Sequence, residues 1–266
     1  RESSAWQEMI AQPYGIILVT GPTGSGKTTT LYTSLKQLAT PEVNVCTIED
    51  PIEQVEPKFN QMQVQTKIDV DFASGVKTLL RQDPDIIMIG EIRDRNTAEM
   101  AVQAALTGHL VLSTLHTNDA PSAVARLSEI GVPPYLISAT LLGVVAQRLV
   151  RTLCPHCKKP VEIDEEQWKS LIRPWKTAAP TTVYQADGCL ECRQTGYMGR
   201  KGIYEIMPLT DELKAGINDD FDLLKFRNIA IKGGMQPLNL AGAQKVAKGI
   251  TTIQEVMKVA PPRYEG

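Results

Sequence analysis

The stretch IILVTGPTGSGKTTT, residues 16–30, decides the fold of this chain of 266 residues. Its apolar beginning predicts a β-strand, its glycine-rich middle predicts a turn, and the residues from Thr28 onward predict a helix. Four positions fill the pattern G-x-x-x-x-G-K-[ST], namely Gly21, Gly26, Lys27 and Thr28. Between a strand and a helix this pattern predicts a phosphate-binding loop, and the alternative is a glycine-rich turn without a ligand.

This loop has the chemistry to hold a nucleotide and its metal ion. Gly24 and Gly26 let the backbone turn its N–H groups inward on an anion, and the positive end of the following helix adds to the attraction. Lys27 is expected to reach the β- and γ-phosphates of ATP or ADP, and the Thr28 hydroxyl is expected to ligate Mg²⁺. The predicted nucleotide-binding residues are Gly21, Pro22, Thr23, Gly24, Ser25, Gly26, Lys27, Thr28 and Thr29.

The composition is that of an ordinary globular protein, with 42% hydrophobic and 22% charged residues. A formal net charge of −2 and dispersed lysines and arginines predict no nucleic-acid partner. No stretch approaches the ~20 apolar residues of a membrane span, and the polar start RESSAWQEMI is unlike a secretory signal. The predicted compartment is therefore the cytoplasm. The chain begins without Met, which is typical of a fragment or a processed chain.

Strand-like and helix-like segments alternate after the loop. Apolar runs at 43–48, 85–90 and 110–115 predict strands, and the second is predicted to be buried on both faces, as in a parallel sheet. Such alternation predicts βαβ units, in which ligands bind beyond the carboxyl ends of the strands. Residues 54–71 are predicted to form an exposed hairpin or a long loop. The helices predicted in this region are 1–12, 28–38, 72–82, 96–106, 119–130 and 134–149.

Carboxylates follow two of the predicted strands. Glu91 follows the apolar strand DIIMIG, where an acid that holds Mg²⁺ or acts on water is expected, although a Gly and a Glu replace the usual Asp. Glu49, Asp50 and Glu53 form a second group, which favours metal ligation or general-base work beside a nucleotide. The alternatives are a solvated Glu at a strand end and an exposed acidic loop.

Two histidines flank the strand 110–115 in the segment TGHLVLSTLHTND. Their spacing along a strand separates His109 from His116 by more than ~20 Å and turns them to opposite sides. Only His116, at the carboxyl end, is expected near the nucleotide, in a phosphate-sensing or positioning role. A structural histidine is the alternative for both.

Two C-x-x-C pairs, separated by 31 residues, predict a structural zinc site. Four thiolates complete a tetrahedral Zn²⁺ site and leave no position open for catalysis. The gap is longer than in common double-knuckle sites, so residues 164–182 are expected to loop out between the pairs. Redox-active dithiols are the alternative, and His156 is an alternative ligand. The four cysteines are Cys154, Cys157, Cys189 and Cys192.

Four ordered motifs resemble those of one protein family. GPTGSGKTTTLY, TIEDPIE, LLRQDPDIIMIGEIRD and TGHLVLSTLHTNDA are similar to the Walker A, Asp-box, atypical Walker B and His-box motifs of the traffic ATPases that drive bacterial type II secretion and type IV pilus assembly. The resemblance runs from about Gln12 to the end of the chain. It implies an α/β fold with a RecA-like P-loop core, a small tetracysteine zinc module and C-terminal helices. The tetracysteine element favours export or pilus extension over pilus retraction.

The resemblance also implies roles for individual residues. Glu91 is the expected general base, and Glu49 and Glu53 are expected to assist the metal ion and the water. His116 is expected to couple the γ-phosphate to neighbouring elements. Two arginines are expected to stabilise developing phosphate charge, with local ion pairing as the alternative. They are Arg81 and Arg93.

The implied assembly is a homo-hexameric ring that turns ATP binding and hydrolysis into movement between protomers. The work passes to an inner-membrane platform protein and a membrane-anchored component, and it drives extrusion of a pilin or pseudopilin fibre. These partners place the ring at the inner face of the inner membrane. The expected domains are a RecA-like ATPase domain at 1–150, the tetracysteine module at 151–203, and C-terminal helices at 204–266 packing on the ATPase domain.

The resemblance further implies a domain before this region, which contributes arginines to the nucleotide site and which the present sequence is expected to lack. The chain is therefore expected to bind nucleotide but to turn it over poorly alone. Two other functions are the alternatives. A DNA-dependent RecA-type motor is disfavoured by the acidic balance, and a nucleotide-binding adaptor that does not hydrolyse is disfavoured by Glu91 and the Asp-box acids.

Overall fold

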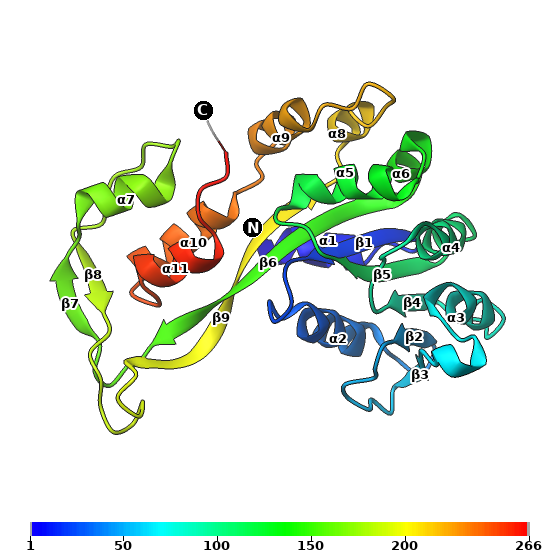
Figure 1. Cartoon of the computed structure of the whole chain (residues 1–266), viewed down its shortest axis with the longest axis horizontal. Coiled ribbons are helices and arrows are strands. Elements are labelled where there is room, and N and C mark those ends of the chain that lie inside the picture. The colour runs from blue at the N-terminus through cyan, green and yellow to red at the C-terminus, as the bar shows by residue number, and fades with distance from the viewer. Residues whose placement is uncertain (1, 265–266) are drawn as a thin grey trace. The chain divides into compact units, whose positions relative to one another are not determined.

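The main sheet of the structure is largely parallel (Figure 1), as the alternation of segments predicts. The computed structural model describes residues 2–264. The strand order is β3-β2-β4-β5-β1-β6-β9, and each pairing from β3 to β6 is parallel. The strands are β1 (Gly15–Thr20), β2 (Val45–Glu49), β3 (Phe59–Gln63), β4 (Ile86–Ile89), β5 (Leu110–Leu115), β6 (Leu141–Leu153) and β9 (Tyr197–Pro208).

Helices cover both faces of the parallel strands (Figure 1). α2 and α4 each pack on β1 and β5, while α3 packs on β2 and β4. Since every residue of β1, β2, β4 and β5 is buried, these strands consist mainly of Ile, Leu and Val. The helices of this part are α1 (Glu2–Ile10), α2 (Lys27–Leu38), α3 (Phe72–Leu79), α4 (Arg95–Leu106), α5 (Ala120–Ile130), α6 (Pro134–Thr140), α8 (Asp211–Ala215) and α9 (Leu223–Lys232).

Aspartates begin three of these helices. Asp71, Asp94 and Asp119 each have extended backbone and accept a hydrogen bond from the N–H three residues on, at about 2.8 Å. This contact satisfies a donor that the first turn of a helix leaves free. The local sequence thus fixes where α3, α4 and α5 start, and with them the loops that follow the strands.

The prediction of one helix over residues 134–149 is wrong. α6 ends at Thr140, and the next thirteen residues form β6, which pairs with β1. The segment LLGVVAQRLV is apolar almost throughout, and a continuous apolar run has no period that separates a buried helix from a buried strand. Tertiary pairing decides the outcome, because the main chain of β6 pairs with the edge of β1 that does not pair with β5.

Three other stretches contain structure that was not predicted. Residues 54–71 contain β3 and a short 3-10 helix, η1 (Thr66–Ile68), rather than a hairpin or an unbroken loop. β9 runs from the expected tetracysteine module into the range expected to be helical, and it lies at the edge of the sheet next to β6. Residues 164–182, expected to loop out, contain α7 (Glu165–Ile172).

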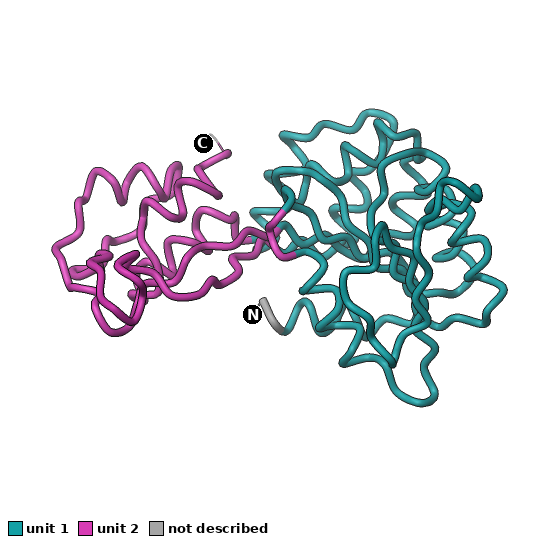
Figure 2. Tube along the Cα trace, turned by 60° about the horizontal axis from the view of Figure 1, so that its bottom comes forward, with its two compact units in different colours: residues 1–23, 27–146, 206–235 teal, residues 24–26, 147–205, 236–266 magenta. Residues whose placement is uncertain are grey.

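The chain divides into two compact units (Figure 2). One comprises the residues up to 23 together with 27–146 and 206–235, and the other comprises 24–26, 147–205 and the residues from 236. The predicted C-terminal range 204–266 is therefore shared between the units. The second unit also contains a two-stranded antiparallel sheet and further helices: β7 (Lys159–Glu162), β8 (Thr182–Gln185), α7, α10 (Leu238–Ala247) and α11 (Ile253–Val259).

An ion pair holds α11 to β6 in the second unit. The Arg151 guanidinium lies 2.6 Å from one carboxylate oxygen of Glu255. The backbone N–H of Arg151 donates to the other oxygen at 3.3 Å. The same guanidinium stacks over the Tyr197 ring, 4.1 Å from its centroid. The hydrogen bond from Arg151 holds the pKa of Glu255 below its usual value.

Glu255→Gln is expected to lower the free energy of unfolding by about 1–2 kcal/mol at pH 7. Because the pKa of Glu255 is lower in the folded state, this contribution is present above the pKa of an unfolded Glu and is lost as the pH falls below it. Urea unfolding at pH 7 and in acid measures the difference. Glu129→Gln, which removes a partner of an exposed pair with Arg126, is the matched control with an effect below about 0.5 kcal/mol. Equal effects for both variants would contradict the assignment.

Candidate active site

The loop that follows β1 has the backbone geometry of an anion cradle. Gly24 and Gly26 have φ angles of +81° and +84°, in the left-handed region that favours glycine. A Cβ at Gly26 would lie 2.7 Å from the Gln147 amide nitrogen, so the space also requires glycine. The buried Ser25 hydroxyl has no hydrogen-bond partner. It is therefore available to donate a hydrogen bond to a bound anion. α2 begins at Lys27, so its N-terminus faces this loop.

Three predicted site residues, one after each of β1, β4 and β5, have side chains that form one connected chain. Lys27 Nζ donates to the Gly21 carbonyl and lies 3.1 Å from His116 Nδ1. On the other side of the ring, His116 Nε2 lies 3.1 Å from a carboxylate oxygen of Glu91. A neutral imidazole with its proton on Nε2 satisfies both contacts, because Nδ1 then accepts from the ammonium and Nε2 donates to the carboxylate. The convergence predicted for these residues is therefore present.

Arg93 extends this chain beyond Glu91. Its guanidinium lies 3.3 Å from the second carboxylate oxygen of Glu91 and 3.6 Å from Asp50, and it stacks on the Phe72 ring. Arg93 is half exposed, so the pairs with Glu91 and Asp50 contribute little to stability. Their effect is to restrict the orientation of the Glu91 carboxylate between an arginine and a histidine.

Glu49 lies at the end of β2 but is buried. It accepts hydrogen bonds from the Tyr32 hydroxyl and from Thr47 Oγ1, the latter at 2.8 Å, and Gln61 lies 3.4 Å away. Burial and the Glu49 carboxylate raise the pKa of Tyr32 well above its usual value. Glu49 is thus bonded to α2 and β3, and none of these partners belongs to the chain from Lys27 to Glu91.

Two other predicted site residues are exposed, and in the described residues neither forms a hydrogen bond or ion pair with Lys27, His116 or Glu91. Glu53 is exposed in the loop between β2 and β3. Arg81 is exposed just after α3, in the segment that leads into the amino end of β4, whereas Glu91 follows the carboxyl end of the same strand. The structure does not bring Arg81 to Lys27 within one chain. His109 precedes β5 and its Nδ1 lies 2.9 Å from the Ala104 carbonyl, a structural contact.

Sequence reasoning missed a partly buried ion pair at Asp119, three residues after His116. Arg227, from α9, lies 2.9 Å from Asp119 and 3.0 Å from the Ser122 hydroxyl. Asp119 is 1% exposed, and its other oxygen caps α5. The capping role of Asp119 is predictable, because it directly precedes Ala-Pro-Ser at the start of a helix. Its partner Arg227 is 108 residues away, so no local sequence pattern predicts the ion pair.

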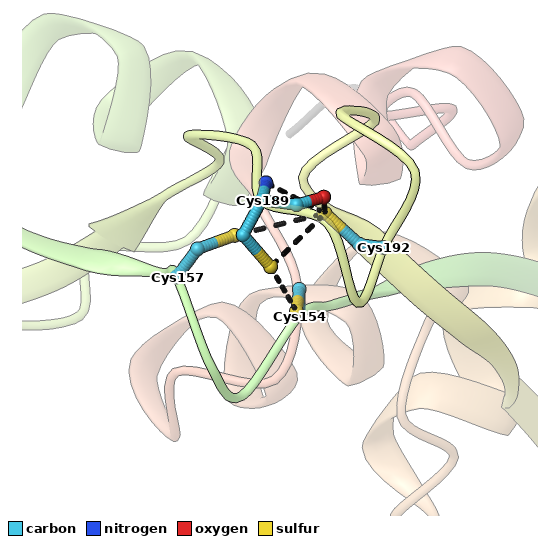
Figure 3. A group of neighbouring side chains, drawn as sticks. All are labelled: Cys154, Cys157, Cys189 and Cys192. Atoms are coloured by element: carbon cyan, nitrogen blue, oxygen red, sulfur yellow. Dashed lines mark hydrogen bonds between the residues drawn. The ribbon is translucent and has the colours of Figure 1, made fainter.

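The four cysteines form one cluster in the second unit (Figure 3). Their sulfur atoms all lie within 4.8 Å of one another, a spacing that suits four ligands around a tetrahedral ion. The intervening segment closes the gap of 31 residues, because β7 pairs antiparallel with β8 and brings Lys159 opposite Gln185. This pairing places the residues after the first knuckle beside those before the second.

The surroundings of the cysteines favour metal binding. Burial opposes ionisation of Cys192, but hydrogen bonds from the backbone N–H groups of Cys189 and Gly196, at 3.2 Å each, lower its pKa to about 6. Burial raises the pKa of the neighbouring Cys157. N–H groups aimed at a sulfur stabilise thiolate, which is the form that binds a metal ion. The donor set therefore fits Zn²⁺, with these four residues as its ligands.

Comparison with known families settles the relationship. The family model described as Type II/IV secretion system protein matches residues 1–258. The chain belongs to this family. The resemblance seen in its four motifs is thereby confirmed.

Members of the Type II/IV secretion system protein family include close relatives of this chain. It is 61% identical over 256 residues to the type IV pilus assembly ATPase TfpB of Acinetobacter baylyi, covering 96% of this chain and 44% of that relative. It is 50% identical over 260 residues to the type II secretion system protein E of Pseudomonas aeruginosa, covering 97% and 51%. The chain thus spans about half the length of the curated relatives it matches.

Two solved structures with a similar fold confirm the architecture. The pilus retraction motor PilT with bound ADP is 28% identical and superposes with a TM-score of 0.71, covering 98% of this chain and 65% of that one. The ATPase DotB of Legionella pneumophila, at 24% identity and the same TM-score, supports the fold alone. The predicted α/β fold of a P-loop ATPase is correct. Among the described residues, no helix combines the length and apolar character needed to cross a membrane.

Proposed function

We propose that this chain is the ATP-hydrolysing part of a type II secretion or type IV pilus assembly motor. The observation that carries the proposal is the connected chain from Lys27 through His116 to Glu91, with 3.1 Å on each side of the histidine ring. A phosphate-binding lysine, a polar relay and a carboxylate at adjacent strand ends are the parts that hydrolysis of a γ-phosphate needs. The relatives named as pilus assembly and secretion ATPases support the same reaction.

Each side chain of the site has a role in this proposal. The loop from Gly21 to Thr29 holds the phosphates by its N–H groups and by Lys27, and Thr28 in the first turn of α2 supplies a hydroxyl ligand to Mg²⁺. Glu91 acts as general base, orienting the attacking water, and His116 reports occupation of the γ-phosphate position because it touches both Lys27 and Glu91. Arg93 orients Glu91.

The remaining predicted residues have subsidiary roles. Glu49 acts indirectly, because its carboxylate is bound by Tyr32 on the helix that follows the phosphate loop. Glu53, exposed in its loop, assists metal and water. Arg81 lies away from Lys27 in its own chain, so it reaches phosphate charge only across a boundary between protomers.

The proposed assembly is a homo-hexameric ring, in which hydrolysis drives rigid-body movement between neighbouring protomers. The ring acts at the inner face of the inner membrane through a platform protein and a membrane-anchored component. Its product is the extrusion of a pilin or pseudopilin fibre. The tetracysteine module binds Zn²⁺ and folds the segment between Cys154 and Cys192 around it.

Steady-state release of phosphate by the full-length protein in Mg²⁺ and ATP tests this proposal. We expect turnover that neither single-stranded nor double-stranded DNA stimulates. Turnover stimulated by DNA and reduced by salt would instead indicate a DNA-dependent motor. Tight ATP binding without any turnover, in the presence of the platform protein, would indicate a nucleotide-binding adaptor.

A further inference from the structure

Hydroxyl side chains gather at the carboxyl end of the buried strands, beside the candidate active site. In β5 the first three residues are apolar, while Ser113 and Thr114 follow them, and in β1 Thr20 is the last residue. All three are buried in the centre of a parallel sheet, where apolar residues predominate. Each of their hydroxyl groups contacts the main chain of a neighbouring strand end.

Thr114 holds both neighbours of Glu91. Its hydroxyl donates to the Gly90 carbonyl at 2.6 Å, and its own carbonyl accepts from the Ile92 N–H at 3.0 Å. Ser113 donates to the carbonyl of Ile89, one residue further back, at 2.8 Å. The peptide groups on either side of Glu91 are therefore fixed to β5, the strand that carries His116 at its end.

Thr20 performs the corresponding task on the other side of β5. Its hydroxyl oxygen accepts from the Thr117 N–H at 2.8 Å and lies 2.6 Å from the Thr117 hydroxyl, which in turn donates to the Asp119 carbonyl at 3.0 Å. Thr20 immediately precedes Gly21, whose N–H donates to the Leu115 carbonyl. The start of the phosphate loop is thus fixed to the turn that contains His116.

We propose that Thr114 and Thr20 are positioning residues for ATP hydrolysis: their hydroxyl groups fix the strand ends that carry Glu91, His116 and the phosphate loop relative to one another. The proposal rests on the function proposed above. Its physical basis is that the contacts from His116 to Lys27 and to Glu91 each span only one hydrogen bond, so a small shift of either neighbouring strand end breaks them. A displacement of about 1 Å at a catalytic group can slow a reaction about a hundredfold.

Thr114→Val and Thr20→Val in the full-length protein test the proposal, since valine keeps the branched shape and removes only the hydroxyl. We expect Thr114→Val to lower kcat about tenfold with a KM for ATP within about threefold of wild type, because Glu91 is displaced but the phosphate loop is not. Thr20→Val is expected to lower kcat and also to weaken ATP binding, because the start of the loop is released. Serine at either position restores the hydroxyl and is expected to restore kcat.

Thr140→Val is the matched control. Thr140 is also buried, but its hydroxyl donates at 2.7 Å to the Leu136 carbonyl within its own helix, α6. Its kcat and KM are expected to stay within about twofold of wild type. Circular dichroism and the melting temperature check that each variant is folded at the assay temperature, and if a valine variant is not, the alanine variant at the same position is measured by the same criterion.

If the wild-type protein hydrolyses ATP and both valine variants have the same kcat as the wild type, the positioning roles are overturned and the proposed function stands. A loss of kcat that serine does not restore would also overturn them, since the hydroxyl would then not be the cause. Absence of turnover in the wild-type protein would instead overturn the proposed function, and the positioning roles with it.

Discussion

Glu91→Gln is expected to abolish steady-state ATP hydrolysis, lowering kcat by about a hundredfold or more, while ATP affinity stays within about threefold of wild type. General acid–base groups contribute factors of about 10²–10⁴ to enzymatic rates. Glutamine keeps the shape of the side chain and accepts a hydrogen bond from His116, but it does not orient or deprotonate water as a carboxylate does. Phosphate release and equilibrium binding of a labelled ATP measure the two quantities on the same preparation.

Glu99→Gln is the matched control for this substitution. Glu99 lies on α4, exposed, and pairs only locally with Arg95 four residues earlier. Its kcat is expected to stay within about twofold of wild type. If Glu91→Gln retained full turnover, Glu91 would not be the general base, and an Asp-box acid such as Glu53 would take that role.

Removal of the metal ion is expected to unfold the part of the second unit that surrounds the four cysteines. Structural zinc sites release about 10–16 kcal/mol on binding, which is folding free energy for segments with little core of their own. Cys154→Ser or Cys192→Ser is therefore expected to lose about one bound Zn²⁺ per chain and to lower the melting temperature by about 10 °C or more. Metal analysis of the purified protein and calorimetry measure the two effects.

His156→Ala separates zinc binding by the cysteines from binding by the histidine between them. His156 is exposed, so its replacement is expected to leave metal content and melting unchanged. A zinc content that survives in the cysteine variants, or a zinc-free protein with an unaltered melting temperature, would contradict a structural tetracysteine site.

Local signals explain why much of the fold was predictable. The strand, loop and helix around Gly21–Thr28 are specified by adjacent residues, and the structure places them as expected, with α2 beginning at Lys27. The start of α5 was likewise predictable, because Asp119 can cap its own helix. The convergence of Lys27, Glu91 and His116 followed from a general property of parallel sheets and needed no knowledge of side-chain contacts.

The errors concern segments whose structure depends on distant partners. β6 was mistaken for a helix because the apolar run LLGVVAQRLV suits a buried helix as well as a buried strand. Only its pairing with β1 decides between the two. The burial of Glu49 was not predicted either, because its hydrogen bond with Tyr32 joins residues that are far apart in the sequence. Arg227 contacts Asp119 across more than a hundred residues of sequence, a distance that no local pattern spans.

In the proposed function, Lys27, His116 and Glu91 form one hydrolytic site, in which binding and cleavage of ATP are separable steps. Rapid chemical quenching of full-length Glu91→Gln protein after mixing with Mg²⁺ and radiolabelled ATP examines this directly, by identifying the nucleotide that stays bound. The predicted result is bound, uncleaved ATP over a period in which the wild-type protein converts its bound nucleotide to ADP. Bound ADP in the variant, formed at the wild-type rate, would contradict the claim.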